Sequence, residues 1–231
     1  QSGVELAESD VKPADRYLME RFICAGFEVE GHAINRDSVR TLVNPRLSEA
    51  DIQPALKAMS LDIKTRGHTD QLYSIAGAMM PAGEQEAVAC VFMIGNAKDE
   101  QREGYQLRYY ADERSLLLAF FNWLEVVDPD LLIGWSIVNF DLDFLDRKCR
   151  SIGVPFAIGR GNEAAAVLQP GNSGQPRIAR VPGRAVLDGI ALLKAGFWAF
   201  ESFSLDNVAH VLLGERKLIT PEQDKVAEIN R

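Results

Sequence analysis

The sequence predicts an α/β domain in which a mixed β-sheet is flanked by helices. Four apolar segments follow one another with short polar connections, as strands joined by hairpins do. Beyond residue 111, short apolar segments alternate with segments of helical periodicity. This order favours a mixed sheet with helices packed on it. The four predicted strands span residues 57–63, 72–76, 88–94 and 105–110.

A smaller β-rich segment precedes this domain. Residues 16–23 predict a short helix or strand, and the segments 27–33 and 38–43 predict a hairpin. We expect Asn44-Pro45 to break that hairpin. The chain starts at Gln1 and ends at Arg231 without features of natural ends, so we expect a piece of a longer protein. The expected division is an N-terminal remnant over 1–55 and the main domain over 56–231.

The second half of the chain predicts alternating helices and strands. Asp112 is typical of a helix N-cap, and Asp128-Pro129-Asp130 would end the helix that follows it. Residues 131–134 predict a buried parallel strand. A helix is expected from about Asp141 to Ser151, with Asp143, Asp146, Arg147 and Lys148 facing out. The remaining expected elements are a long excursion over 161–176, a β-hairpin over 177–186, a strand ending at Asp188, and helices over 192–197 and from Ser204 to Gly214.

The composition is that of an ordinary globular protein. The formal net charge of −8 and pI near 5.0 argue against nucleic-acid binding by bulk electrostatics, although they permit an enzyme whose acids hold metals. No apolar run approaches the roughly 18–20 residues that cross a bilayer, so no membrane partner is expected. Three cysteines without CxxC spacing predict free buried thiols in a reducing cytoplasm. The three histidines are too far apart for a zinc motif.

Asp62 and Lys64 form an altered version of a metal site. The run Ala58 to Ile63 predicts a buried strand ending at a carboxylate, and side chains two residues apart point to the same face of a strand. Two acids at positions 62 and 64 would bind hard cations such as Mg²⁺. The second position holds a lysine, which opposes metal binding.

Asp141 is a second candidate acid. It follows the predicted strand 131–134 and opens a predicted helix, near the carboxyl ends of the sheet where ligands of open α/β sheets lie. A helix-capping role is one interpretation. Coordination of a metal shared with Asp62 is the other.

Several motifs together resemble the proofreading exonuclease domain of B-family DNA polymerases. The shared stretches cover the chain from about residue 11, and some point to a bacterial branch of that family. They are Leu61-Asp62-Ile63, Ile133-Gly134-Trp135-Ser136, Asn139-Phe140-Asp141-Leu142, and the segments 16–23, 183–190 and 199–205.

The resemblance implies a ribonuclease H-like domain that removes nucleotides from a single-stranded 3′ end of DNA. Four carboxylates and a tyrosine would surround two Mg²⁺ or Mn²⁺ ions. Asp62 would contact both ions and Asp141 the outer one, while position 64 should be a glutamate. The final motif, with its tyrosine, does not follow Asp188, so we expect the chain to stop before it. Ser136 also stands where the family usually has asparagine.

These departures predict that metal binding is weakened or absent and that the chain has no exonuclease activity. We expect Lys64 to pair with Asp62 or Asp141 in the metal's place. An alternative is a non-catalytic nucleic-acid-binding or scaffolding module on the same fold. The resemblance also implies that the parent enzyme is a DNA-directed DNA polymerase of replication and repair. Such an enzyme would act in the bacterial cytoplasm at the nucleoid. Its partners would be further polymerase domains in the same chain and a sliding clamp.

Five residues are weaker candidates for DNA contacts: Asn139, Phe140, Arg177, Arg180 and Arg184. The arginines lie on the predicted hairpin 177–186, and a solvated hairpin face is the competing interpretation. We expect Asp188 to accept backbone hydrogen bonds rather than to bind metal. Trp135 and the aromatic cluster Phe197, Trp198, Phe200 and Phe203 could stack on bases, but their near-helical spacing favours core packing.

Overall fold

A computed structural model describes residues 11–24, 26–36, 39–66, 70–80, 88–169 and 176–216. The chain divides into two units, Gln1–Ala55 and Leu56–Arg231. Within the described ranges, no helix is both long enough and apolar enough to span a bilayer. Cys90 and Cys149 are free and buried, whereas Cys24 is free and exposed, so burial was wrongly expected for the last.

The described part of the first unit contains one short helix and a long hairpin. Helix α1 spans Pro13–Met19, and the antiparallel strands β1 and β2 span Phe27–Arg36 and Val39–Glu49. The expected break at Asn44-Pro45 was wrong. These two residues lie opposite the single Gly31, so the strand bulges and continues, and Asn44 takes a left-handed φ of 46°.

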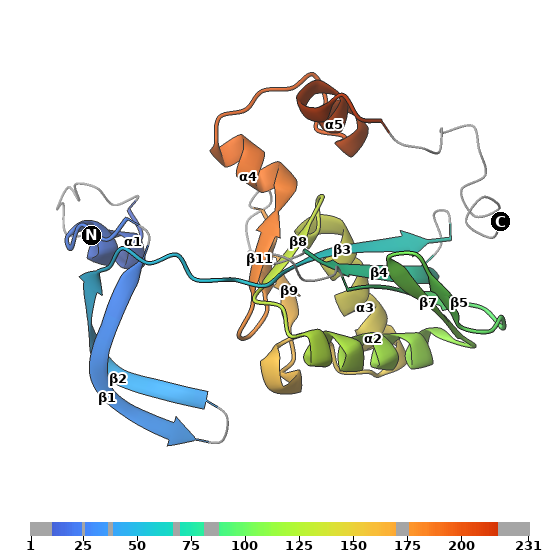
Figure 1. Ribbon diagram of the computed structural model, residues 1–231, viewed down its shortest axis with the longest axis horizontal. Coiled ribbons are helices and arrows are strands. Elements are labelled where there is room, and N and C mark those ends of the chain that lie inside the picture. Colours follow the sequence, from blue (N-terminus) through green and yellow to red (C-terminus); the bar gives the residue numbers. More distant parts are fainter. Residues whose placement is uncertain are drawn as a thin grey trace, which may run out of the picture. The chain divides into compact units, whose positions relative to one another are not determined.

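A seven-stranded mixed sheet forms the second unit (Figure 1). The strand order is β11-β8-β3-β4-β5-β7-β6, with parallel pairs β11–β8, β8–β3 and β5–β7. The strands are β3 (Ala58–Thr65), β4 (Leu72–Met79), β5 (Ala89–Ile94), β6 (Glu100–Arg102), β7 (Tyr105–Tyr110), β8 (Leu131–Gly134) and β11 (Ala185–Asp188). The predicted mixed sheet is confirmed; β6 was not predicted, because it is three exposed polar residues long.

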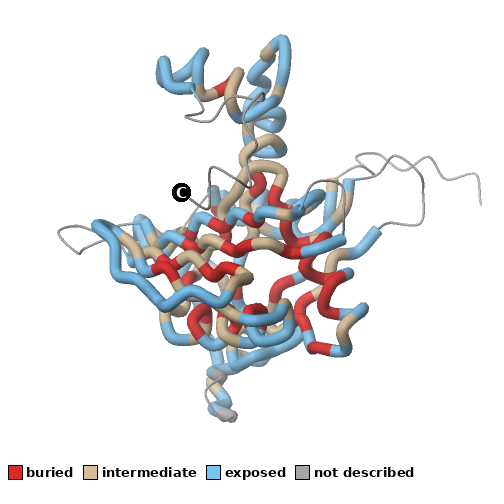
Figure 2. The backbone as a smooth tube through the Cα atoms, turned by 90° about the vertical axis from the view of Figure 1, so that its right-hand side faces the viewer, coloured by how far each residue is buried: buried red, intermediate tan, exposed pale blue. Residues whose placement is uncertain are grey.

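Helices α2 (Glu113–Val127) and α3 (Asp143–Ile152) lie on the same side of the sheet in Figure 1. Asp112 caps α2, since its Oδ1 accepts a hydrogen bond from the Ser115 N–H at 2.8 Å. Leucines and aromatic residues of α2 are buried with Phe92 of β5 in the core. Figure 2 shows that buried residues concentrate in the sheet and its covering helices.

Two charged residues of α3 are buried, contrary to expectation. The Asp146 carboxylate accepts a hydrogen bond from the Val167 N–H at 2.9 Å and pairs with Arg150. The Lys148 ammonium lies 3.1 Å from a carboxylate oxygen of Glu113. Paired in this way, both charges tolerate burial on the helix face that meets the rest of the domain.

The predicted hairpin over residues 177–186 is wrong. Strand β10 (Ile178–Arg180) pairs with β9 (Ala166–Leu168), which lies in the predicted excursion, and β11 pairs instead with β8. The turn at Pro182-Gly183 therefore connects two different sheets. A 3₁₀ turn, η2 (Arg160–Asn162), precedes β9.

Within the described ranges, two further helices follow β11. Helix α4 spans Gly189–Ala195 and α5 spans Leu205–Leu213. Ser204 caps α5 and Gly214 ends it with a φ of 72°, as predicted. Helix α4 begins earlier than expected because Asp188 caps it directly.

Candidate active site

Strand β3 places Asp62 and Lys64 on the exposed face of the sheet. Its residues alternate between buried and exposed, and Met59, Leu61 and Ile63 enter the core. The Lys64 ammonium forms an ion pair with the Asp62 carboxylate. About half of the Lys64 side chain (49%) and 60% of the Asp62 side chain are exposed. The expected pairing of Lys64 with Asp62 is confirmed.

Strand β3 does not end at Asp62 but continues to Thr65, and it loses one of its two neighbouring strands after Ser60. Strand β8 pairs with β3 only along Ala58–Ser60, whereas β4 pairs with β3 as far as Thr65. Beyond Ser60, the β8 side of β3 is therefore free of strand pairing. Gly134 ends β8 at this point, and a side chain there would lie 2.9 Å from the Leu61 carbonyl oxygen.

Asp141 occupies this open edge. It lies in a π-helical turn, η1 (Val138–Leu142), and is 2% exposed. Its Oδ1 accepts a hydrogen bond from the backbone N–H of Ile63 at 2.9 Å. The helix-capping interpretation is wrong, because this carboxylate bonds a strand rather than a helix N-terminus. π-turns of this kind recur at functional sites.

Burial raises the pKa of Asp141 to about 7. Loss of hydration is the largest cause, and the nearby charge of Asp62 adds to it. The Ile63 N–H and the Lys64 ammonium act in the opposite direction. The charges of Asp62 and Lys64 therefore act on Asp141, and these three residues are called the site group below.

Asp188 holds the backbone around this group. Its Oδ1 accepts hydrogen bonds from the N–H groups of Ile190 and Ala191, and its Oδ2 lies 3.3 Å from the Val138 nitrogen. One carboxylate thus ties β11, α4 and η1 together. The predicted structural role of Asp188 is confirmed. Ser136, in the loop before η1, has a left-handed φ of 58°, a conformation that asparagine adopts more readily than serine.

Three of the five DNA-contact candidates lie near η1. Asn139 and Phe140 are exposed on the turn itself, with Phe140 49% exposed. Arg177 reaches the same place: its guanidinium lies 2.7 Å from the Asp143 carboxylate and 3.4 Å from the Asn139 carbonyl oxygen. Arg180 is exposed on β10.

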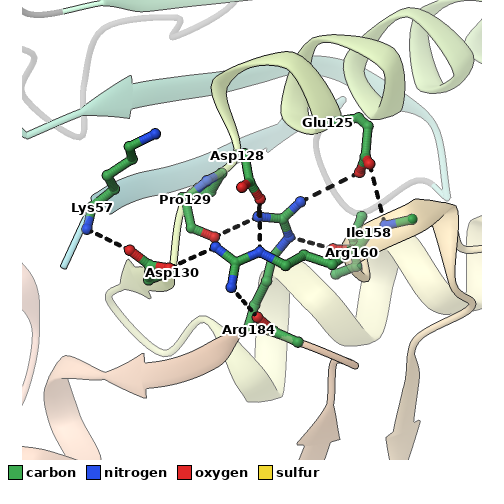
Figure 3. Close-up of polar contacts among 10 residues, drawn as sticks. Lys57, Glu125, Asp128, Pro129, Asp130, Ile158, Arg160 and Arg184 are labelled. Carbon is green, nitrogen blue, oxygen red and sulfur yellow. Dashed lines mark hydrogen bonds and ion pairs between the residues drawn. The ribbon is translucent and has the colours of Figure 1, made fainter. Parts of the chain in front are cut away.

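Arg184 lies elsewhere, and its expected exposure on a hairpin was wrong. Arg184 lies just before the first residue of β11, whereas Asp188, which contacts η1, is the last residue of that strand. Its side chain is fully buried and its Nη1 lies 2.8 Å from Asp128 Oδ1 (Figure 3). Its Nε donates to the Ile158 carbonyl at 3.0 Å. This geometry gives Arg184 a structural role.

Arg160 joins the same network. Its Nε and Nη2 lie 2.8 and 2.6 Å from carboxylate oxygens of Asp128 and Asp130 (Figure 3). Burial alone would raise the pKa of Asp128, but the Arg160 and Arg184 guanidinium groups hold it below its ordinary value. The Asp128 backbone is left-handed, with a φ of 44°, and ends α2. The predicted helix stop is therefore also the centre of an ion-pair network.

The aromatic cluster after α4 is not a core segment, contrary to expectation. Phe197 is 95% exposed and Trp198 53% exposed. The rings of Trp198 and Phe200 stack with centroids 6.1 Å apart. Trp135 supports the segment by donating its indole N–H to the Phe203 carbonyl at 3.0 Å.

A cleft that the sequence did not reveal adjoins Asp62. It has a volume of about 910 Å³ and lies over the exposed face of β3, β4, β5 and β7. Alanines at 76, 78 and 89 contribute to its lining, together with Tyr105 and Tyr109. The only sequence signal was the small size of Ala76, at the end of the predicted second strand, and of Ala78 just after it, and small side chains do not identify a ligand.

The residues present do not fit a two-metal centre. Asp62 and Asp141 supply carboxylate oxygens, but the third side chain of the group is the Lys64 ammonium. Among the residues that the structure describes, His, Cys, Asp and Glu nowhere gather in a group of three that could hold a metal ion. A fixed positive charge beside Asp62 opposes the binding of a divalent cation there.

The mixed sheet and its covering helices are those of a ribonuclease H-like exonuclease domain. The chain belongs to the exonuclease domain family of family B DNA polymerases, whose model matches residues 8–208.

Known relatives include bacterial, eukaryotic and archaeal polymerases. DNA polymerase II of Escherichia coli (strain K12) is 38% identical over the whole of this chain and 28% of its own length. The DNA polymerase delta catalytic subunit of Schizosaccharomyces pombe is 26% identical over 76% of this chain and 18% of its own length. A DNA polymerase of Thermococcus kodakarensis is 25% identical over 77% of this chain and 10% of its own length. The chain thus spans less than a third of these relatives.

Proposed function

We propose that this chain is the editing domain of a DNA polymerase II-like enzyme, and that its exonuclease site receives DNA 3′ ends without hydrolysing them. The parent type of enzyme would use Mg²⁺ or Mn²⁺ and remove nucleotides in the 3′→5′ direction. Polymerase domains in the same chain, a sliding clamp, and a place at the bacterial nucleoid belong to the same proposal. So does the assignment of residues 1–55 to the polymerase N-terminal region and of 56–231 to the exonuclease domain.

The observation that carries the proposal is the ion pair between Lys64 and Asp62. A carboxylate bound to an ammonium is a poorer ligand for a divalent ion, because the ion must displace or approach a like charge. At about 4 Å and an effective dielectric constant near 20, one unit charge repels a divalent ion by several kcal/mol. Asp141 remains as the second carboxylate of the proposed metal site.

DNA would approach over the η1 turn. The exposed ring of Phe140 can stack on a base, and Arg177 supplies positive charge nearby. Arg180 adds an exposed positive charge on β10. Arg177 already pairs with Asp143, which reduces its strength as a phosphate contact. Asn139 is exposed beside them.

Two measurements test the proposal. The unaltered chain should not shorten a 5′-labelled single-stranded oligonucleotide in Mg²⁺ or Mn²⁺, and strong 3′→5′ digestion would contradict the predicted inactivity. The Lys64→Glu variant should gain Mn²⁺ binding by calorimetry. Lys12→Glu makes the same change in net charge within the separate 1–55 unit and should gain none. Failure of Lys64→Glu to bind Mn²⁺ would overturn the assignment of the metal site.

The second candidate function is a non-catalytic nucleic-acid-binding or scaffolding module on the same fold. The Asp62–Lys64 ion pair favours it as well, since a retained lysine preserves the domain surface while preventing hydrolysis. The two candidates differ in what Lys64→Glu does. In a longer chain that includes the final motif, restored metal binding followed by digestion supports an altered exonuclease, and metal binding without any digestion supports a binding module.

A further inference from the structure

The Lys64 ammonium lies where its charge can act on a bound phosphodiester. Its Nζ pairs with Asp62, and within the described ranges this is the one hydrogen bond that Nζ makes. An ammonium has three N–H donors, so two remain for other acceptors. Because half of the side chain is exposed, those donors are open to solvent and to a ligand.

The charge of the group differs from that of an all-carboxylate site. Several carboxylates together repel a phosphodiester, so such a site needs cations before DNA can enter. Here the positive charge is already present on a side chain and is anchored by Asp62. The Lys64 ammonium therefore offsets the Asp62 charge without any dissolved ion.

The cleft beside Asp62 can accept the rest of a nucleotide. Its volume of about 910 Å³ is within the usual range of ligand sites, about 300–1,000 Å³. The small side chains of Ala76 and Ala78 let a base or sugar approach the sheet closely. Tyr105 and Tyr109, also in its lining, offer aromatic rings on which a base can stack.

We propose that this site binds the end of a single DNA strand without a divalent ion, with Lys64 contacting a phosphate and the adjoining nucleotide lying in the alanine-lined cleft. The inference rests on the proposed function and specifies how its site holds DNA. Lys64 thus binds DNA in addition to opposing the binding of metal.

The test measures fluorescence anisotropy of a short 5′-fluorescein-labelled oligodeoxythymidylate with the full chain. The dissociation constant should agree within about twofold between EDTA and Mg²⁺, since no ion takes part. Lys64→Gln should weaken binding in EDTA about tenfold or more, because a charge-assisted hydrogen bond is lost. The same variant should also lower the slope of the logarithm of affinity against the logarithm of salt concentration by about one. Lys64→Arg keeps the charge and should retain most of the affinity.

Two further variants separate a site from general charge effects. Ala78→Trp fills the cleft without changing charge and should also weaken binding, whereas Lys12→Gln should not. Thermal unfolding of each variant verifies that it is folded. The inference is overturned if EDTA abolishes binding, or if folded Lys64→Gln and Ala78→Trp bind like the parent. That result leaves the Mn²⁺ measurement on Lys64→Glu unaffected, so the two proposals fail separately.

Discussion

The buried Asp141 carboxylate accepts a hydrogen bond from the backbone N–H of Ile63, with 2.9 Å between Oδ1 and the nitrogen. The two residues are 78 positions apart in the sequence. The bond fills the edge of β3 that β8 leaves open after Ser60. It places a buried acid beside the Asp62–Lys64 ion pair and closes the η1 turn onto the sheet.

The pKa of Asp141 predicts a stability that falls as the pH rises. Its folded-state pKa of about 7 lies above the ordinary value of 3.8, so the folded state holds the proton more tightly. The stabilisation is complete below pH 3.8 and is lost as the pH rises to about 7. The difference corresponds to about 4 kcal/mol.

Asp141→Asn should remove this contribution while its side-chain oxygen still accepts the Ile63 N–H. Urea unfolding from pH 4 to 8 should show a smaller decline for the variant, which becomes more stable than the parent at pH 8. An unchanged pH dependence would show that Asp141 is ionised throughout.

Arg184→Met should destabilise the domain by about 1–3 kcal/mol. The substitution removes a fully buried guanidinium that bonds Asp128 and the Ile158 carbonyl, and it leaves the buried Ile158 carbonyl without this donor, whereas Asp128 keeps its ion pair with Arg160. Arg102→Met breaks an exposed ion pair with Glu100 and should cost less than about 1 kcal/mol. Denaturant midpoints of both variants provide the comparison, and equal midpoints would contradict a structural role for Arg184.

Asp188→Ala should cost about 2 kcal/mol or more, because three backbone N–H groups lose their acceptor. Asp188→Asn keeps an oxygen acceptor and should cost less. Hydrogen exchange should show faster exchange at Val138 and Ile190 in the alanine variant. If Val138 stays protected, the carboxylate does not hold the η1 turn.

Gly77→Ala should destabilise the domain by about 1–3 kcal/mol through overpacking. A methyl group at this buried position of β4 would lie 2.6 Å from the Trp123 ring of α2. Trp123→Phe shortens the ring at that contact. In a double-mutant cycle the combined variant should therefore lose less stability than the sum of the single changes. Strict additivity would show that the two side chains do not meet.

The sequence predicted the strands and helices well where local chemistry decides them. Asp112, Ser204 and Gly214 end or begin helices through bonds to their own neighbours, and each was identified. The strand of Leu131–Gly134 was recognised from its short apolar run. Predictions that depended on distant partners were less successful. β10 was assigned the wrong partner, and the charges of Asp146 and Lys148 were placed in solvent, because pairing and burial depend on segments far along the chain.

Residue identity by itself determined that a carboxylate and a lysine share one face of a strand at Asp62 and Lys64, since side chains alternate along any strand. It also determined the family, through short motifs spread over the chain. Only the tertiary structure decided that Asp141 is buried against Ile63, that Arg184 is an internal ion-pair partner, and that a cleft adjoins Asp62. The physical reason is that hydration and charge pairing depend on which distant groups surround a side chain, and those neighbours exist only once the sheet has formed.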